Sequence, residues 1–231
     1  KHRIVESFLP ESFTSGSIAA KFATMPILNW GELSFYLFAG VSAIQIEDQE
    51  FPKKCGHTPY RRVKRTEDMV AKIRVAVASR QDPNFLVIAR TDARTGLGFD
   101  EALRRGQAYA EAGADVVFVE SLQSEDEMRR ACAGIRAPLI ANMSDGGKTP
   151  IRSKAELQAL GYRMAIWPAL AALSASAAIE GAMRHLKEKG TSVSPEVALF
   201  GFDEFCRMVG FEEVWAFEER WKDVLDKRAS P

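Results

Sequence analysis

The chain lacks most of the features that mark specialised protein classes. Its 231 residues include only three cysteines, an odd and widely spaced set (Cys55, Cys132 and Cys206) that does not resemble a disulfide framework and favours a reducing compartment. Lys and Arg number 31, as do Asp and Glu, so the net charge is zero and gives no reason to expect nucleic acid or an anionic membrane as a partner. No signal peptide is apparent after the basic N-terminus, and the apolar run at 35–46 is too short to span a bilayer. We therefore expect a cytoplasmic protein that binds neither nucleic acid nor membrane.

The chain does contain a regular alternation of short apolar runs and longer amphipathic segments. The apolar runs predict buried strands at 43–47, 86–91, 116–120, 139–142 and 164–167. Between them, Thr66, Asp100, Ser124 and Ser153 are expected to cap helices, and the last helix should stop at Gly161. Ser124 and Ser153 each have a glutamate three residues later, as in a capping box. Five strand–helix repeats predict a parallel sheet, open or closed.

Polar side chains follow four of the five predicted strands. The active sites of (β/α)8 barrels gather at the C-terminal ends of their strands, so these side chains are expected to share one site. Any single case has a simpler explanation, because chains commonly turn polar where a strand ends. Their recurrence favours the shared site, and the polar groups are Glu47 and Asp48; Arg90, Thr91 and Asp92; Glu120 and Ser121; Asn142 and Ser144.

The segment 44–57, IQIEDQEFPKKCGH, is the most informative part of the chain. Two adjacent carboxylates, Glu47 and Asp48, follow an apolar run, and such groups suit a divalent metal or a proton relay. Cys55 comes next, bracketed by Lys53, Lys54 and His57, and neighbouring cations favour the thiolate form of a cysteine. The segment therefore predicts a reactive thiol close to a metal site, although Cys55 as an ordinary loop thiol and His57 as a surface histidine are simpler alternatives.

The last forty or so residues change in character. Large apolar side chains are scattered among acids and bases there, which predicts one or two amphipathic helices with aromatic faces. These faces are expected to pack either on the chain's own barrel or on another subunit. The apolar residues are Phe200, Phe202, Phe205, Val209, Phe211, Val214, Trp215, Phe217 and Trp221.

At this point the sequence resembles the isocitrate lyase and phosphoenolpyruvate mutase superfamily, most closely its methylisocitrate lyase branch. The segment 40–49, GVSAIQIEDQ, followed by PKKCGH at 52–57, carries the most specific part of the resemblance. Further matches are ARTDA at 89–93, AGAD at 112–115 leading to Glu120, and ANMS at 141–144. The resemblance covers roughly residues 36–190.

The resemblance implies a barrel enzyme that cleaves a carbon–carbon bond beside a hydroxyl group, with Mg²⁺ or Mn²⁺ as cofactor. Cys55 would be the catalytic acid or base, with Lys54 and His57 as its catalytic neighbours. Arg90, Asn142 and Ser144 would bind substrate carboxylates, and Glu120 would orient Arg90 or the metal-bound substrate. Glu47 and Asp48 would hold the metal.

The N-terminal part departs from the family pattern. About three strand–helix units precede the strand of Glu47 in the family, yet only about forty residues do so here, and one βαβ unit alone takes roughly thirty or more residues. Residues 1–47 contain no aspartate, whereas a pair of aspartates on an earlier strand supplies the family's direct metal ligand. We therefore expect a (β/α)8 TIM-barrel fold with parallel strands that lacks part of the N-terminal barrel. Substitute strands at 3–8 and 25–30, or a partner chain, would cover its edges.

These inferences give a domain plan and competing functions. Residues 1–190 are expected to form the catalytic domain, with an atypical segment at 1–40, and residues 191–231 a C-terminal helical extension exchanged between the subunits of a homo-oligomer, a dimer or tetramer. The first hypothesis is a Mg²⁺-dependent lyase that cleaves a small hydroxy-di- or tricarboxylate to succinate and a 2-keto acid. The alternatives are an oxaloacetate decarboxylase or related keto-acid hydrolase, and a truncated, non-catalytic homologue that acts as a binding or assembly module.

Overall fold

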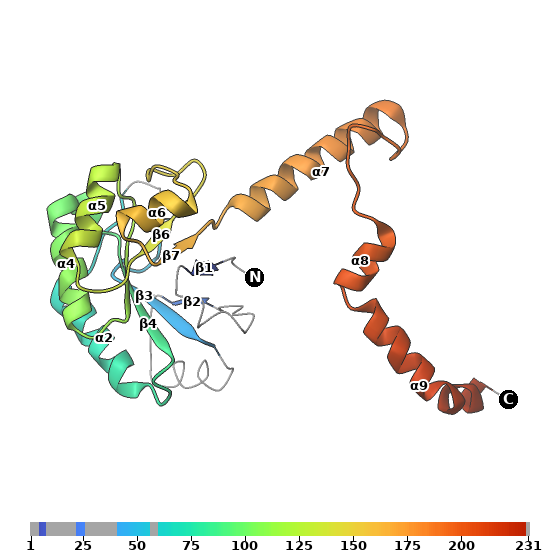
Figure 1. The fold of residues 1–231 in the computed structure, drawn as a ribbon, viewed down its shortest axis with the longest axis horizontal. Coiled ribbons are helices and arrows are strands. Elements are labelled where there is room, and N and C mark those ends of the chain that lie inside the picture. The colour runs from blue at the N-terminus through green and yellow to red at the C-terminus, as the bar shows by residue number, and fades with distance from the viewer. Residues whose placement is uncertain (1–4, 8–21, 26–40, 56–59, 230–231) are drawn as a thin grey trace. The chain divides into compact units, whose positions relative to one another are not determined.

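The computed structural model describes residues 5–7, 22–25, 41–55 and 60–229 (Figure 1). The chain forms two compact units, Lys1–Ala171 and Ala172–Pro231. In the described residues the first unit combines parallel strands with covering helices, and the second is built from helices. The boundary expected at residue 190 falls at the end of a helix of the second unit, so the division into domains at that point stays a prediction.

The described strands of the first unit form two sheets, and a bridge connects the two. One sheet has the order β2 (Phe22–Met25), β3 (Ala43–Glu47), β4 (Leu86–Thr91) and β5 (Val116–Val119), all parallel. The other has the order β1 (Val5–Ser7), β7 (Met164–Ile166) and β6 (Ile140–Asn142), with β6 and β7 parallel. A parallel bridge between Val117 and Leu139 connects β5 to the start of β6. The predicted parallel α/β class is therefore confirmed.

The two N-terminal strands lie at the outer edges of this arrangement. β2 pairs in parallel with β3, and β1 pairs antiparallel with β7, where a regular (β/α)8 barrel has only parallel neighbours. A strand was expected at 3–8, and β1 lies inside that range. The second expected strand, at 25–30, meets β2 only at Met25, and the rest of that range lies outside the described residues.

Alternation along the strands separates two apolar layers. Ile44 and Ile46 of β3 belong to the large cluster that packs against the helices, together with Val87 and Val117. Ala43 points to the opposite face and joins a smaller cluster with Ile88, Val116, Phe118, Ile140 and Ile166. Strands buried on both faces must be apolar at every position, which explains why they were readable as continuous runs. On the smaller cluster's face, Gln45 is polar in the middle of β3, and Glu47, Arg90 and Asn142 are polar at the C-terminal strand ends.

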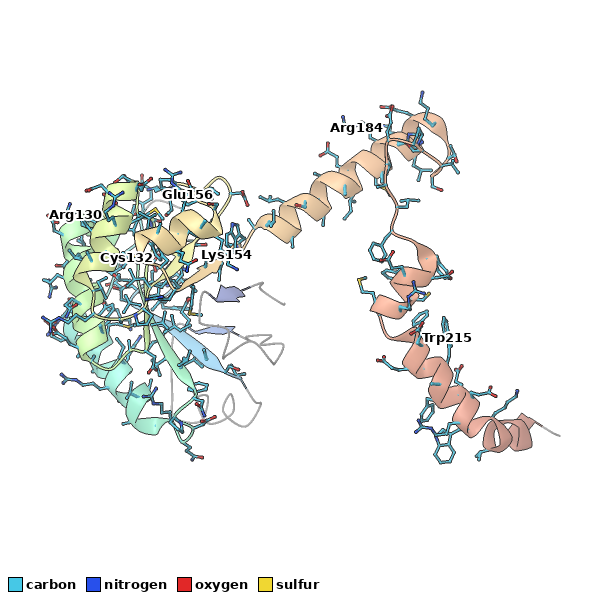
Figure 2. The ribbon with its side chains drawn as sticks, viewed as in Figure 1. Arg130, Cys132, Lys154, Glu156, Arg184 and Trp215 are labelled. Carbon is cyan, nitrogen blue, oxygen red and sulfur yellow. The ribbon has the colours of Figure 1, made fainter. Side chains whose placement is uncertain are left out.

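The helices of the first unit are α2 (Thr66–Ser79), α3 (Ala93–Leu97), α4 (Phe99–Glu111), α5 (Glu125–Gly134) and α6 (Lys154–Leu160). Figure 1 shows α2, α4 and α5 side by side along one face of the strands. The capping box at Ser153 and the stop at Gly161, which has φ 107°, are confirmed. Figure 2 labels Cys132 on α5, and a Cβ on Gly161 would lie 3.0 Å from the Cβ of Cys132.

Two of the predicted helix caps are wrong. Thr66 is the first helical residue of α2, because its hydroxyl accepts a hydrogen bond from Arg104 Nη2 (2.8 Å) instead of capping the helix. α4 begins at Phe99 after Gly98, and Asp100 forms an ion pair with Arg130 at 3.2 Å. At Ser124 the hydroxyl does cap α5, but the side chain of the third residue, Glu127, accepts from Gln123 N.

The second unit contains α7 (Leu170–Lys189), α8 (Phe202–Met208) and α9 (Phe211–Ala229). One or two amphipathic helices were predicted after residue 199. The structure has two there, α8 and α9. Their apolar side chains are largely exposed, such as Phe202 at 77% and Trp215, labelled in Figure 2, at 53%. Within the described residues, no helix combines the length and the apolar character needed to cross a bilayer.

Candidate active site

Glu47 and Arg90 meet because β3 and β4 are parallel and in register. Glu47 is the direct partner of Arg90 in the ladder, so both side chains leave the same end of the sheet on the same face. Both residues are buried, and Arg90 Nε lies 3.6 Å from Glu47 Oε2. The C-terminal strand ends thus bring together charges that no apolar core would hold without partners.

Arg90 is the centre of the cluster. Its Nε and Nη2 donate to Asp92 at 2.8 and 2.9 Å, Nη2 lies 2.7 Å from Glu120 Oε2, and the guanidinium stacks over Phe118 at 4.7 Å. Burial alone would lower the pKa of Arg90, but the carboxylates of Glu120, Asp92 and Glu47 outweigh burial and raise that pKa, so the charge is permanent. Within the described residues these contacts use Nε and Nη2. A guanidinium is a fork of five N–H donors, so a group held in this way suits a ligand carboxylate.

Glu120 and Asn142 complete the cluster. Asn142 Nδ2 lies 3.2 and 3.4 Å from the two oxygens of Glu120, and a carboxylate can only accept, so the NH₂ end of the amide must face it. The buried Oδ1 of Asn142 has no hydrogen-bond partner among the described residues. The atom that Asn142 leaves open is therefore an acceptor, which suits a hydroxyl group better than the carboxylate that the resemblance implied.

Glu47 has one oxygen bound and one open. Lys53 Nζ donates to Oε2 at 2.6 Å, whereas the buried Oε1 accepts no hydrogen bond from any described residue. An unsatisfied buried carboxylate oxygen is costly unless a ligand binds it, and carboxylate oxygen is the ligand type that Mg²⁺ prefers. Glu47 therefore fits a metal role. Sequence reasoning noted Lys53 only as a neighbour of Cys55; its spacing of six residues from Glu47 was the available signal.

The metal role predicted for Asp48 does not fit this geometry. Its buried carboxylate accepts hydrogen bonds from Thr91 Oγ1 (2.7 Å), Asp92 N (2.9 Å), Tyr109 Oη (2.8 Å) and Arg105 Nη1 (3.2 Å). Burial raises the pKa of Asp48 even though these hydrogen bonds act to lower it. With four protein donors on two oxygens, Asp48 joins β3 to β4 and α4 instead of facing a metal.

Asp92 and Arg61 belong to the cluster, but the sequence analysis gave neither residue a role in the site. Asp92 accepts both bonds from Arg90 and a third from Arg61 Nη1 at 2.8 Å. Burial would raise the pKa of Asp92, but the hydrogen bonds and charges of Arg90 and Arg61 lower it, so the carboxylate stays ionised. From the sequence, Asp92 was listed among the polar groups at the strand ends without a role of its own, and Arg61 was given no role.

The remaining predicted residues are Lys54, Cys55, His57 and Ser144, and the contacts seen for Lys54 and Ser144 are with other loop residues. Cys55 is exposed. Lys54 Nζ donates to the carbonyl of Tyr60 (3.2 Å), and its backbone N–H donates to Gln49 Oε1 (3.0 Å). His57 lies outside the described residues. Ser144 is half-buried, and its carbonyl accepts from Gly147 N in a turn (2.9 Å). The roles proposed for these residues stay predictions.

The chemistry of the donor set allows a weakly held divalent metal. No group of three or more His, Cys, Asp or Glu side chains suited to a metal occurs in the residues that the structure describes. Glu47 Oε1 is the single open carboxylate oxygen of the cluster there. Since Mg²⁺ is commonly bound through one or two carboxylates plus substrate and water, this set is small but sufficient.

A parallel α/β sheet with ionised and amide groups at its C-terminal strand ends defines the class of barrel-type enzymes with a polar active site. More particularly, the chain belongs to the phosphoenolpyruvate phosphomutase family, whose model matches residues 35–187. The resemblance inferred from the sequence is thereby confirmed.

The chain is similar in sequence to two curated relatives and in structure to two solved enzymes. The chain is 44% identical over 186 residues to 2,3-dimethylmalate lyase of Eubacterium barkeri, covering 80% of this chain and 64% of the relative. It is 41% identical over 189 residues to 2-methylisocitrate lyase of Aeropyrum pernix, covering 82% and 60%. The structure resembles oxaloacetate acetylhydrolase in complex with 3,3-difluorooxalacetate, with TM-score 0.77, 28% identity and coverage of 86% and 69%. It also resembles phosphonopyruvate hydrolase in complex with oxalate and Mg²⁺, with TM-score 0.72, 30% identity and coverage of 87% and 71%.

The chain spans less than two thirds of the length of these two curated relatives. The family is established on the matched part. The activity, the substrate and the assembly of the whole protein are matters for proposal.

Proposed function

We propose that the chain is a Mg²⁺-dependent carbon–carbon lyase that cleaves a small hydroxy-dicarboxylate or hydroxy-tricarboxylate. The observation that carries this proposal is the cluster of Glu47, Arg90, Glu120 and Asn142, in which two buried atoms, Glu47 Oε1 and Asn142 Oδ1, have no hydrogen-bond partner among the described residues. The Arg90 guanidinium can donate to a carboxylate, Asn142 Oδ1 can accept from a hydroxyl, and Glu47 Oε1 can bind a cation. A hydroxy acid with a bound divalent metal presents the three matching groups.

The cluster would bind and orient such a substrate. Arg90 is held by Asp92 and Glu120, so its guanidinium is fixed before a carboxylate arrives, and fixed groups lose little entropy on binding. Asn142 is held by Glu120 in the same way, which presents Oδ1 to the substrate hydroxyl. Glu47 would hold the Mg²⁺, and that ion would supply positive charge against the negative charge that develops on the keto-acid oxygens.

The reaction would be a reverse aldol-type cleavage. A base removes the hydroxyl proton, the electrons of the O–H bond form the carbonyl of a 2-keto acid, and the carbon–carbon bond breaks. Its electron pair passes to the second product as an enolate-like carboxylate, which must take up a proton at carbon. Cys55 is proposed as that proton donor. Lys53, two residues before Cys55, already contacts Glu47 at 2.6 Å, so the segment that carries the thiol begins at the cluster.

The named relatives support lyase chemistry over the alternatives but leave the substrate open. A lyase would release pyruvate and propionate from 2,3-dimethylmalate, or pyruvate and succinate from 2-methylisocitrate. Hydrolysis of a keto acid such as oxaloacetate is the second candidate, because a structural neighbour is named oxaloacetate acetylhydrolase. A non-catalytic binding or assembly role is the third, since the chain spans only part of its relatives. We also propose that β3–β7 correspond to the last five strands of a (β/α)8 barrel, and that the helical extension contributes to a homo-oligomer.

A substrate panel tests the proposed reaction. The protein is incubated with MgCl₂ and 2,3-dimethylmalate, 2-methylisocitrate, isocitrate or oxaloacetate, and release of pyruvate, glyoxylate, succinate, propionate and oxalate is measured. We expect cleavage of one hydroxy acid and loss of about 100-fold or more of that activity in Cys55→Ser, which is the scale of a general acid. Cys132→Ala is the matched control, because burial raises the pKa of the Cys132 thiol to about 12 and makes it a poor proton carrier. Oxalate release from oxaloacetate alone would favour the hydrolase, and no turnover of any acid would favour the non-catalytic role.

A further inference from the structure

Arg61 lies on a backbone stem that returns from the segment of Cys55 to the sheet. Residues 48–50 pair with 62–64 through Glu50 N to the Arg62 carbonyl (3.0 Å) and Lys64 N to the Asp48 carbonyl (2.7 Å). The carbonyl of Arg61 lies beside α3, 3.8 Å from where a Cβ on Gly96 would be. Unlike most arginines, Arg61 has a side chain that is only 2% exposed.

The buried guanidinium of Arg61 shares a partner with the substrate-binding arginine. Arg61 Nη1 donates to Asp92 Oδ1 at 2.8 Å, and Arg61 Nη2 donates to the hydroxyl of Thr95. Asp92 Oδ1 also accepts from Arg90 Nη2, and Asp92 Oδ2 accepts from Arg90 Nε. Arg61, Asp92 and Arg90 are thus linked in a row, with side chains at most 9% exposed, and electrostatic coupling is strong where water is excluded.

A second buried arginine, Arg105, also holds the stem. Arg105 Nη1 donates to the Lys64 carbonyl at 2.8 Å and contacts Asp48, so the stem is fastened a second time next to its backbone pairs. A buried ion pair is weak evidence for stability, because the desolvation of both charges offsets much of their attraction. Arg61 also leaves its buried Nε without a hydrogen-bond partner among the described residues, which adds to that cost. A role beyond fastening accounts better for its burial.

We propose that Arg61 is a positioning residue that acts through Asp92 to fix the orientation of Arg90. The link couples the stem of the Cys55 segment to the group that binds the substrate carboxylate, so that a displacement of the stem changes carboxylate binding. The proposal rests on the proposed function for the role of Arg90 as carboxylate ligand. The coupling itself is a property of the protein without substrate.

The coupling is tested first without any ligand. Hydrogen–deuterium exchange is followed by mass spectrometry on peptides that cover 86–97 in the wild type, in Arg61→Met and in Arg62→Met. Arg62 is the matched control, because it is the adjacent arginine, its side chain is 81% exposed, and it pairs with the partly exposed Glu50 at 2.8 Å. Arg61→Met is expected to speed exchange around Arg90 to Thr95, whereas Arg62→Met should leave it at the wild-type rate. Equal rates in both variants would overturn the coupling, whatever the protein's activity.

The effect on carboxylate binding is tested next by calorimetry with oxalate and MgCl₂. We expect Arg61→Met to weaken oxalate binding on the order of tenfold, as loss of an outer-shell partner does, with Arg61→Lys recovering part of the affinity and Arg62→Met unchanged. A purely structural Arg61 would lower the unfolding temperature without this pattern, and faster exchange with unaltered oxalate affinity would overturn the positioning role. If the wild type neither binds oxalate nor turns over any acid, the proposed function fails, while the exchange experiment still decides the coupling.

Discussion

The open atoms of the cluster matter more than its charges, because the charges are already paired. The carboxylates of Glu47, Asp92 and Glu120 face the cations of Lys53, Arg61 and Arg90, three against three. A pocket that is neutral in itself does not attract a ligand by net charge. Recognition then depends on the few donors and acceptors that the pairing leaves over, which is why a metal-bound hydroxy acid fits better than a simple anion.

Glu47→Gln is expected to weaken Mg²⁺ activation on the order of tenfold or more, since the amide offers a poorer ligand than the open carboxylate oxygen. The measurement is the MgCl₂ concentration that gives half-maximal cleavage of the accepted acid. Glu50→Gln is the control, because Glu50 is 39% exposed and pairs with Arg62 at the surface. An unchanged requirement for MgCl₂ in Glu47→Gln would show that Glu47 does not hold the metal.

Asp48→Asn should lower the stability of the fold and leave the MgCl₂ requirement nearly unchanged, the opposite of Glu47→Gln. The amide cannot accept from all four donors, and Arg105, whose side chain is 6% exposed, would lose its buried partner. We expect a loss of about 3 kcal/mol in the free energy of unfolding, as for other broken buried pairs, with little change in the half-activating MgCl₂ concentration. Urea unfolding and the activation assay measure the two quantities. A stable variant with a raised MgCl₂ requirement would restore Asp48 as a metal ligand.

At the scale of elements, the strands were predicted almost residue by residue. Residues 43–47 and 86–91 match β3 and β4 at both ends, and the other three strands end one residue early or begin one late. Continuous apolar runs determine such strands locally, because both faces must be buried. Helix starts were less predictable where a tertiary partner takes the capping side chain. Thr66 accepts from Arg104 and Asp100 pairs with Arg130, and neither partner is near in sequence.

Glu101, a carboxylate on helix α4, makes the free energy of unfolding depend on pH. Glu101 accepts from Arg104 and Arg105, and these hydrogen bonds lower its pKa from 4.5 to about 2, the bond from Arg104 contributing most. A lowered pKa of an acid stabilises the fold above pH 4.5, and this gain is lost as the pH falls from 4.5 through about 2. Because the side chain is 27% exposed, solvent screening reduces the gain to about 1 kcal/mol or less.

We therefore expect the stability difference between wild type and Glu101→Gln to depend on pH. Wild type should exceed Glu101→Gln in the free energy of unfolding at pH 7, and the difference should shrink as the pH approaches 2. Urea unfolding of both proteins at several pH values measures it. A difference that stays constant from pH 7 to pH 2 would show that the Glu101 carboxylate is not the source.

For the whole molecule, the contacts that define the site come from residues far apart in the chain. Strand-end chemistry and motif resemblance pointed to Glu47, Arg90, Glu120 and Asn142, and the parallel register brings those four together. The same reasoning could not foresee that Asp48 would turn to α4, because that depends on Tyr109 and Arg105 sixty residues or so away. Arg61 was missed for a similar reason, since a basic run before a helix is usually solvated.

Many large apolar side chains of the second unit are exposed. Exposed large apolar side chains on α9 include Val214, Trp215, Phe217 and Trp221, and Phe211 packs edge-on against Trp215 at 6.0 Å. Such patches commonly mark interfaces. We expect the wild type to sediment as a homo-oligomer and Trp215→Glu to have a lower mass, with Lys222→Glu as a control that changes charge on the same helix. A monomeric wild type, or an oligomer indifferent to Trp215→Glu, would contradict an interface at α9.

The most direct test of the central claim is a proton NMR experiment on the cleavage reaction in D₂O with MgCl₂. If the Glu47–Arg90–Glu120–Asn142 cluster is the active site of a lyase, a 2,3-dimethylmalate or 2-methylisocitrate substrate will yield pyruvate and a second carboxylate in equal amounts. The second product will carry one deuterium at the carbon released by the bond cleavage, and Arg90→Met will abolish both products. Loss of CO₂, products without deuterium at that carbon, or full activity in Arg90→Met would contradict the account.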